Sequence, residues 1–474
     1  MPADRGTSAL GILRIRLVGW QPVPPSTATE LMLYAHVPGT LRSGVEVFDG
    51  RRVVVARSVS RHHAGALVRT DGAKIARAAE AALAQRLPLA LVLSTSGSEV
   101  SEGIDALHGW GKAAAAVSAC SGIVPVLAAV TGAAISGPAL LLGLADVAIM
   151  TPDAFSYLSG PDAVEGFTGI RMGPRELGGT ALHATTSGLC ALVAADEAQV
   201  PELFAVVLGY LPDHTDETPP RIPTSDPPDR LAPELHRIVP ESGRATYDVR
   251  EVIRSVVDDA ELLELRSGWA PQIVTALASI AGTAVGVVAN QPRSLAGTLD
   301  IAAAQKGARF VRFCDSFNLP LVTFVDTPGF LPGKDREWRG IIRHGAELAF
   351  AYAEATVPRV CVVLRKAYGG AYIVMDSKAI GNDVCLAWPT AEIAVMGAKG
   401  AAQILRRQGT EQEQQELEER YAEELLTPWV AAERRYVDDV IDPADTRVAV
   451  WRALELLSTR RERLPARKHD AGPM

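Results

Sequence analysis

Four short segments of the first half of the chain recur, in the same order, in its second half. The separation between partners stays between 232 and 237 residues, a drift too small for four independent coincidences. The paired segments are residues 86–92 with 318–324, residues 122–125 with 355–358, Gly137 with Gly370, and residues 158–161 with 395–398. A repeat of this period predicts two copies of one structural unit, each of about 200 residues.

A proline-rich stretch separates the two copies. Residues 212–233 contain seven prolines among many charged side chains. Because proline lacks an amide hydrogen and restricts the residue before it, this stretch is expected to be an irregular connection. We therefore predict an N-terminal domain over residues 1–225 and a C-terminal domain over residues 226–474.

Short apolar runs alternate with longer segments of helical character. Residues 53–56, 89–93, 125–130 and 147–150 are expected to be buried strands, and residues 73–85 a helix. This alternation is typical of an α/β fold.

Residues 113–145 carry no charged side chain and are long enough for a membrane-spanning helix, which needs about 20 apolar residues. Pro125, Pro138 and four glycines break the run, so we predict a buried helix, a strand and a second helix instead, with no membrane partner. The first 19 residues include Arg5, Arg14 and Arg16, and no signal peptide is expected there.

The net charge of −8 argues against nonspecific binding to nucleic acid, which needs a basic surface. The five cysteines are scattered, without the close spacing of a zinc site. We therefore expect no metal site, and we expect a reducing, cytoplasmic location.

An ordered series of motifs covers nearly all of residues 240–465. The motifs are VANQP (288–292), ARFVRFCD (308–315), VDTPGFLPG (325–333), IRHGA (342–346), EATVP (354–358), RKAYGGAY (365–372), AWPT (387–390), AVMGA (394–398) and WVAAER (429–434). Together they resemble the carboxyltransferase (beta) subunit of biotin-dependent acetyl- and propionyl-CoA carboxylases.

The resemblance implies an α/β fold of two tandem crotonase-like β-β-α superhelix domains, in agreement with the duplication. It also implies that the first half of one subunit faces the second half of another, in hexamers built from dimers. The sequence contains no ATP-binding carboxylase domain and no Met-Lys-Met biotin attachment site. Carboxybiotin is therefore expected to arrive on a biotinylated alpha subunit or carrier protein.

The reaction implied by the resemblance places negative charge on two oxygens, the ureido oxygen of biotin and the carbonyl oxygen of the acyl thioester. Backbone N–H groups held in place are a suitable device for both, and the ureido anion itself can accept the α-proton. By resemblance, Gly370 and Ala371 supply the N–H groups for biotin. The alternative is a turn that only links a strand to a helix. The residues implied to line the biotin pocket are Thr327, Pro328, Gly329, Phe330, Tyr368 and Gly369.

The residue after Tyr372 distinguishes acyl chains in the family, with Asp in propionyl-selective enzymes and Ile in acetyl-accepting ones. Here it is Ile373, which favours a substrate other than propionyl-CoA alone. An apolar side chain also fits an ordinary core position.

The first half departs from the family at two places. The family motif SGGARxxEG aligns with residues 95–103, so that Ser96, Gly97 and Ser98 are the implied CoA-binding residues and Glu99 replaces the arginine. The Gly-Gly-Ala of the acyl-CoA oxyanion loop aligns with Ser136, Gly137 and Pro138. Ser136 and Gly137 keep N–H groups, whereas Pro138 has none.

We predict carboxyl transfer from carboxybiotin to a short acyl-CoA such as acetyl-CoA or propionyl-CoA. Two alternatives stay open at this point. One is a biotin-dependent decarboxylase, or a carboxylase of an unusual acyl substrate in secondary metabolism. The other is a weakly active subunit that serves as a scaffold for an active paralogue.

Overall fold

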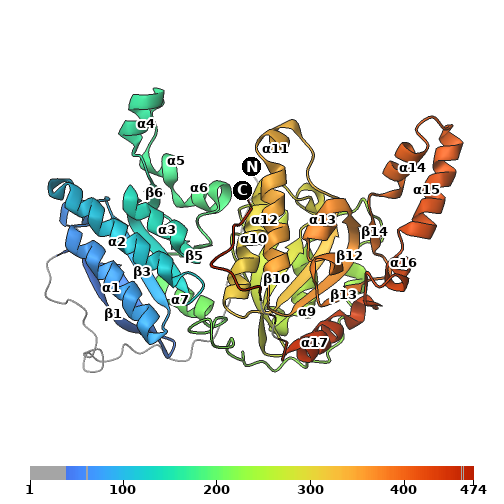
Figure 1. Cartoon of the computed structure of the whole chain (residues 1–474), viewed down its shortest axis with the longest axis horizontal. Coiled ribbons are helices and arrows are strands. Elements are labelled where there is room, and N and C mark those ends of the chain that lie inside the picture. Colours follow the sequence, from blue (N-terminus) through green and yellow to red (C-terminus); the bar gives the residue numbers. More distant parts are fainter. Residues whose placement is uncertain (1–38, 60–61, 461, 463, 474) are drawn as a thin grey trace, which may run out of the picture.

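The computed structural model describes residues 39–59, 62–460, 462 and 464–473. The N-terminal segment in which we expect no signal peptide lies outside these residues. In the part described, two β-sheets lie side by side along the long axis of the molecule, each with helices on its faces (Figure 1).

Within the described residues the first sheet has seven strands in the order β1-β2-β3-β4-β5-β7, with β6 paired to β4. The β1–β2 pair is antiparallel and all other pairs are parallel. The strands are β1 (Leu41–Phe48), β2 (Arg51–Ser58), β3 (Leu89–Thr95), β4 (Val126–Ile135), β5 (Val147–Met150), β6 (Phe155–Tyr157) and β7 (Leu192–Val193).

The second sheet repeats this topology with one additional strand, in the order β15-β13-β12-β11-β10-β9-β8, with β14 paired to β12. The β9–β10 hairpin corresponds to β1–β2, and β11 and β12 correspond to β3 and β4. The strands are β8 (Leu262–Glu264), β9 (Ile273–Ile280), β10 (Thr283–Asn290), β11 (Leu321–Thr327), β12 (Arg359–Tyr368), β13 (Val384–Ala387), β14 (Glu392–Ala394) and β15 (Asp439–Val440).

Helices connect the parallel strands and cover both sheets. In the first half they are α1 (Arg69–Gln85), α2 (Ile104–Cys120), α3 (Leu140–Leu144), α4 (Pro161–Thr168), α5 (Pro174–Gly178), α6 (Thr180–Leu182) and α7 (Val200–Leu208). In the second half they are α8 (Leu235–Ile238), α9 (Val249–Val256), α10 (Ile301–Ser316), α11 (Lys334–Trp338), α12 (Ile341–Glu354), α13 (Gly369–Val374), α14 (Ala398–Leu405), α15 (Glu411–Leu425), α16 (Pro428–Glu433) and α17 (Thr446–Leu457).

The expected α/β layering is confirmed by these elements. The four predicted strands lie in β2, β3, β4 and β5, and the predicted helix lies in α1. Residues 113–145 form the end of α2, then β4 and α3, as expected for a buried run broken by prolines. No helix in the described part of the chain is long and apolar enough to cross a bilayer.

One buried apolar cluster joins the two halves. It includes Val55 and Phe204 from the first half and Leu277, Phe310 and Leu348 from the second. Helices α10 and α12 therefore pack between the second sheet and the first half. Two further clusters lie on the outer faces, under α1 and α2 in the first half and under α9 and α17 in the second.

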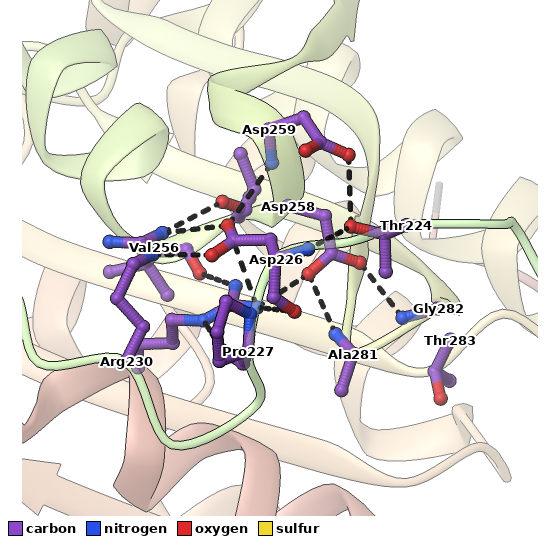
Figure 2. Close-up of polar contacts among 12 residues, drawn as sticks. Thr224, Asp226, Pro227, Arg230, Val256, Asp258, Asp259, Ala281, Gly282 and Thr283 are labelled. Carbon is purple, nitrogen blue, oxygen red and sulfur yellow. Dashed lines mark hydrogen bonds and ion pairs between the residues drawn. The ribbon is translucent and has the colours of Figure 1, made fainter.

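The proline-rich connection is irregular, as expected, and charged groups anchor it to the second half (Figure 2). Asp226 accepts hydrogen bonds from Arg230 Nε at 2.6 Å and from the amide of Asp259 at 3.2 Å. Asp258 accepts from the amides of Ala281 and Gly282, at 2.9 and 2.8 Å.

Arg447 of α17 completes this cluster from the other end of the chain. Its guanidinium is fully buried and donates to Asp258 Oδ1 and to the Val256 carbonyl, each at 2.6 Å. It also donates to the carbonyl of Pro227 at 3.1 Å. The connection is thereby held against the second half, and the domain boundary within it, between residues 225 and 226, stays a prediction.

Candidate functional site

Two loops with the same backbone follow β3 and β11. In the first, Thr95 Oγ1 accepts from the amide of Gly97 at 3.1 Å and donates to its carbonyl at 3.2 Å. In the second, Thr327 and Gly329 make the same pair of contacts, both at 3.4 Å. Each loop follows a register shift in the parallel pairing, between Leu93 and Thr95 and between Val325 and Thr327. The duplication therefore includes the candidate ligand loops and not only the sheets.

A second pair of contacts fixes each loop from the side. The amide of Leu67 donates to the carbonyl of Gly97 at 2.8 Å, and the amide of Glu99 donates back to Leu67 at 2.9 Å. Leu299 makes the matching contacts with Gly329 and Leu331, at 3.1 and 2.8 Å. The two loops thus differ mainly in their side chains.

Glu99, which the motif resemblance aligns with an arginine of the family, has a local structural role. Its Oε1 accepts from the amide of Ser101 at 3.1 Å and from Ser101 Oγ at 2.7 Å. The side chain caps a single helical turn, Val100–Glu102. This capping contact accounts for a carboxylate at the position, because a capping side chain must accept hydrogen bonds from backbone amides.

The loops that follow β4 and β12 are also equivalent. Ser136 has a φ of 63° and a ψ of −145°, and Gly369 has a φ of 60°. Each residue leads into a helical turn, Gly137–Ala139 in the first half and α13 in the second. The residues equivalent to Gly370 and Ala371 are therefore Gly137 and Pro138.

Helix geometry decides which amides at these positions can reach a ligand. The N–H groups of the first helical turn have no acceptor within the helix, so those of Gly370 and Ala371 can donate to a bound oxygen. The amide of Ser136, in contrast, donates to the carbonyl of Tyr157 at 2.9 Å. Gly137 is left as the donor of the first loop, because Pro138 has no N–H group.

Trp110 of α2 packs against the first loop, which the sequence analysis did not foresee. A Cβ atom built on Gly137 would lie 2.5 Å from Trp110 Cε2 and 2.7 Å from Nε1. Any side chain at residue 137 would therefore displace the indole. Trp110 Nε1 is buried and has no hydrogen-bond partner among the described residues.

In the second half the structure brings the predicted biotin residues together. A Cβ atom on Gly370 would lie 3.7 Å from Phe330 Cε2, an ordinary contact distance. Thr327 pairs with Ala367 across β11 and β12, so residues 327–330 lie beside residues 368–371. Tyr368 is fixed from the other side by a contact of its hydroxyl with Glu392.

The buried carboxylate of Asp326 supports both of these loops, and it was not predicted from the sequence. Asp326 accepts from the hydroxyl of Tyr247 at 2.9 Å, from Arg365 Nε at 3.2 Å and from the amide of Lys366 at 3.1 Å. Burial raises the pKa of Asp326, and the positive charge of Arg365 works in the opposite direction. The sequence did contain a signal for this group, namely an aspartate directly before the Thr-Pro-Gly turn of residues 327–329.

Ile373 lies on the same side of α13 as Gly370, one helical turn further on. Its side chain is 37% exposed, so it is not an ordinary core residue in the chain described. The equivalent residue of the first half, Leu140, is 47% exposed. Both positions present an apolar side chain next to a candidate oxyanion loop.

The predicted residues form two separate groups within one chain. In the first half, a Cβ atom on Gly97 would lie 3.4 Å from Ser136 Cβ, so residues 96–98 adjoin the 136–138 loop. In the second half the biotin residues gather at α13 as described. Helix α3 follows the first candidate oxyanion loop, and helix α13 begins with the second. The two helices lie apart in Figure 1, with α10 and α12 between them in the view.

Comparison with known proteins gives consistent relatives. The model of the carboxyl transferase domain family matches residues 30–471. The chain is 42% identical over 433 residues to a propionyl-CoA carboxylase carboxyltransferase subunit of Haloferax mediterranei, with 90% of this chain and 84% of the relative covered. It is 38% identical over 433 residues to the alpha subunit of a methylmalonyl-CoA decarboxylase of Veillonella parvula, covering 91% and 85%.

A solved structure is about as similar to this chain as these relatives are. The crystal structure of transcarboxylase 12S superimposes with a TM-score of 0.90 at 41% identity, covering 92% of this chain and 85% of that one. Its description names a hexamer assembly with hydrolysed methylmalonyl-coenzyme A bound.

Proposed function

The chain belongs to the carboxyl transferase domain family, and from that premise we propose that it transfers a carboxyl group from carboxybiotin to the α-carbon of a short acyl-CoA, such as acetyl-CoA or propionyl-CoA. The fold that the family resemblance implied, two tandem crotonase-like α/β units, is the fold of this chain. The alternatives of a decarboxylase and of a weakly active scaffold are less favoured, because the relatives include several carboxyltransferase subunits of carboxylases at 39–42% identity.

The observation that supports this function best is the position of Phe330 beside the first turn of α13. The amides of Gly370 and Ala371 point out of a helix N-terminus, where a developing negative charge is stabilised. Phe330 forms an apolar wall at contact distance from Gly370. An apolar wall next to two N–H donors fits a flat ring that carries one polar oxygen.

Carboxybiotin, when bound there, would supply the carboxyl group and a ureido oxygen that gains negative charge as the carboxyl group leaves. The residues of this chain would hold that oxygen through the amides of Gly370 and Ala371. Each such donor contributes about 100- to 1000-fold in rate. The Asp326 group holds the ends of β11 and β12 in position beneath these amides.

On the acyl side, we assign the thioester oxygen to the amide of Gly137. Residues 96–98 adjoin this loop and form the proposed contact with CoA. The first half therefore offers one amide where the second half offers two, because Pro138 replaces the residue equivalent to Ala371.

Neither group of residues makes a complete site within one chain, since α3 and α13 lie apart. We propose that the first half of one copy faces the second half of another, in dimers that assemble into a hexamer. The hexamer assembly of the 12S relative supports this arrangement. We further propose that carboxybiotin is carried by a separate biotinylated subunit and that the assembly is cytoplasmic.

The experiment combines the purified chain with a biotinylated partner subunit, ATP, labelled bicarbonate and a panel of acyl-CoA substrates. We expect label to enter the acyl product only when chain, partner and acyl-CoA are all present. No label in any product across the panel would contradict the proposal. Sedimentation of the chain as a stable monomer at micromolar concentration would contradict the shared site.

A further inference from the structure

A cavity of about 500 Å³ lies at the junction of the two halves, and its lining residues do not include those of either candidate oxyanion loop. The first half contributes the C-terminal end of α3 and residues 183, 187, 188 and 189. The second half contributes Arg266 and Trp269 from the loop between β8 and β9, and residues 305, 306 and 309 from α10. Its volume lies within the range of about 300–1,000 Å³ that is usual for small-molecule sites.

The charge of this cavity is one-sided. Arg266, Lys306 and Arg309 line it, and no aspartate or glutamate is among the lining residues. Two carboxylates act on these side chains from outside the lining. Asp146 accepts from the amide of Val126 at 2.9 Å and lies 3.7 Å from Arg309 Nη2, and the charge of Glu264 acts on Lys306. Two carboxylates outside the lining thus oppose the three basic side chains within it.

The two arginines keep donors available. Arg266 donates through Nε to the carbonyl of Gly188 at 2.8 Å, and its terminal amino groups have no hydrogen bond to any described residue. Arg309 donates through Nη2 to the carbonyl of Ala145 at 3.0 Å, and the described residues accept nothing from its Nε or Nη1. Each guanidinium group is therefore oriented by one hydrogen bond to a backbone carbonyl. Its remaining N–H groups are available to a ligand.

Lys306 holds the loop that carries Arg266 and Trp269. Its buried ammonium donates to the carbonyls of Arg266, Trp269 and Ile273 at 3.0, 2.9 and 2.7 Å. These contacts use all three hydrogens of the protonated group, so Lys306 orders the loop without contacting a ligand, and burial lowers its pKa to about 7. Arg266 itself has a φ of 56°, a rare backbone conformation that often accompanies a binding function.

The cations also act unfavourably on one another. Burial, and secondly the like charge of Arg309, lower the pKa of Arg266 to about 10. A bound anion between the two guanidinium groups would offset this repulsion. A guanidinium offers paired N–H donors in the geometry that phosphate oxygens accept.

We propose that this cavity binds a phosphorylated small molecule, with the phosphate between Arg266 and Arg309 and the remainder of the ligand against Trp269. Both halves form its walls, so binding links them. The ligand chemistry could come from free phosphate or from the phosphate-bearing end of a nucleotide-like molecule such as CoA. The volume exceeds that of phosphate alone and favours the larger ligand.

The test is binding to the assembled full-length protein, measured by calorimetry and by the melting temperature, without any turnover. The probes are inorganic phosphate, adenosine 3′,5′-bisphosphate and adenosine, with potassium chloride at matched ionic strength as the salt control. We expect saturable binding and a higher melting temperature with both phosphate compounds and neither with adenosine. If the bisphosphate binds more tightly than inorganic phosphate, the ligand is nucleotide-like. If the two bind equally, the ligand is free phosphate.

Arg309→Gln is the decisive variant, because its side chain is 49% exposed and its removal leaves the core intact. We expect at least about tenfold weaker phosphate binding in this variant. Arg452→Gln, at an exposed position on α17, is the matched control and should bind as the native protein does. Two results would overturn the proposal: no saturable binding of either phosphate compound to the assembly, or an unchanged phosphate affinity in Arg309→Gln. The first result would also be obtained if another copy of the chain filled the cavity.

Discussion

Ser136 and Gly369 adopt the same left-handed φ, 63° and 60°, at the same point of the two duplicated units. Only glycine adopts such a conformation with an extended ψ at little cost, and another residue there costs about 1–3 kcal/mol. The first oxyanion loop therefore holds strain that the second avoids. Its amide contact with Tyr157 and its packing against Trp110 keep the loop in place.

Replacing Ser136 with glycine should stabilise the chain. Relief of the strain exceeds the entropy that glycine adds to the unfolded state, so we expect a gain of about 1 kcal/mol in the free energy of unfolding. Differential scanning calorimetry would measure it as a higher melting temperature. Ser118→Gly, at an exposed position within α2, should lower stability by roughly 0.5 kcal/mol. An equal loss of unfolding free energy in Ser136→Gly and Ser118→Gly would mean that Ser136 is unstrained.

Replacing Pro138 with alanine should raise the rate on acetyl-CoA or propionyl-CoA. The change restores an N–H group equivalent to that of Ala371, and one such donor is worth up to about 100- to 1000-fold in kcat. Adding Glu99→Arg should raise the rate further, although the hydrogen bonds from Ser101 are lost. Pro174→Ala, at the start of α5, is the control. A native turnover of roughly ten per second would show that Pro138 is harmless.

Replacing Gly370 separates the amide from the backbone shape. Gly370→Pro removes one N–H group and should abolish carboxyl transfer with little change in acyl-CoA binding. Gly370→Ala keeps the amide, and its methyl group would lie 3.7 Å from Phe330, so turnover should persist. Steady-state rates and calorimetric acyl-CoA affinities distinguish the two effects. Native turnover in the proline variant would leave Gly370 a purely structural role.

Replacing Ile373 with aspartate should shift the ratio of kcat/KM towards propionyl-CoA over acetyl-CoA. The exposed side chain lies one turn beyond Gly370 in the biotin half, where an acyl chain held by the first half of another copy would meet it. Asparagine has nearly the volume of aspartate but no charge, so Ile373→Asn isolates the effect of the carboxylate. A ratio unchanged in both variants would place this side chain outside the acyl pocket.

Removing Arg447 should destabilise the second half strongly. Arg447→Met leaves the buried carboxylate of Asp258 without its cationic partner, at a cost of about 3–5 kcal/mol. Arg221→Gln breaks an exposed contact with Glu455 and should cost less than about 1 kcal/mol. Chemical denaturation would compare the two variants. A small loss in Arg447→Met would mean that other contacts anchor the connection.

The sequence by itself determined the duplication, the α/β layering and the family. These properties depend on local patterns, namely apolar runs, helical segments and ordered motifs such as residues 365–372, and such patterns are visible one segment at a time. The motif alignment also predicted that the first candidate oxyanion loop lacks a donor at Pro138, because an absent N–H group is a property of the residue itself.

Tertiary structure alone decided which groups meet. Arg447 and Asp258 are 189 residues apart, and Arg309 and Ala145 are 164 apart, so no local pattern could indicate either contact. The amide of Ser136 was a reasonable candidate donor until the pairing of β4 with β6 assigned it to Tyr157. The position of Trp110 against Gly137 and the cationic cavity between the halves likewise arise from packing, because side chains on separate elements converge only when the chain folds.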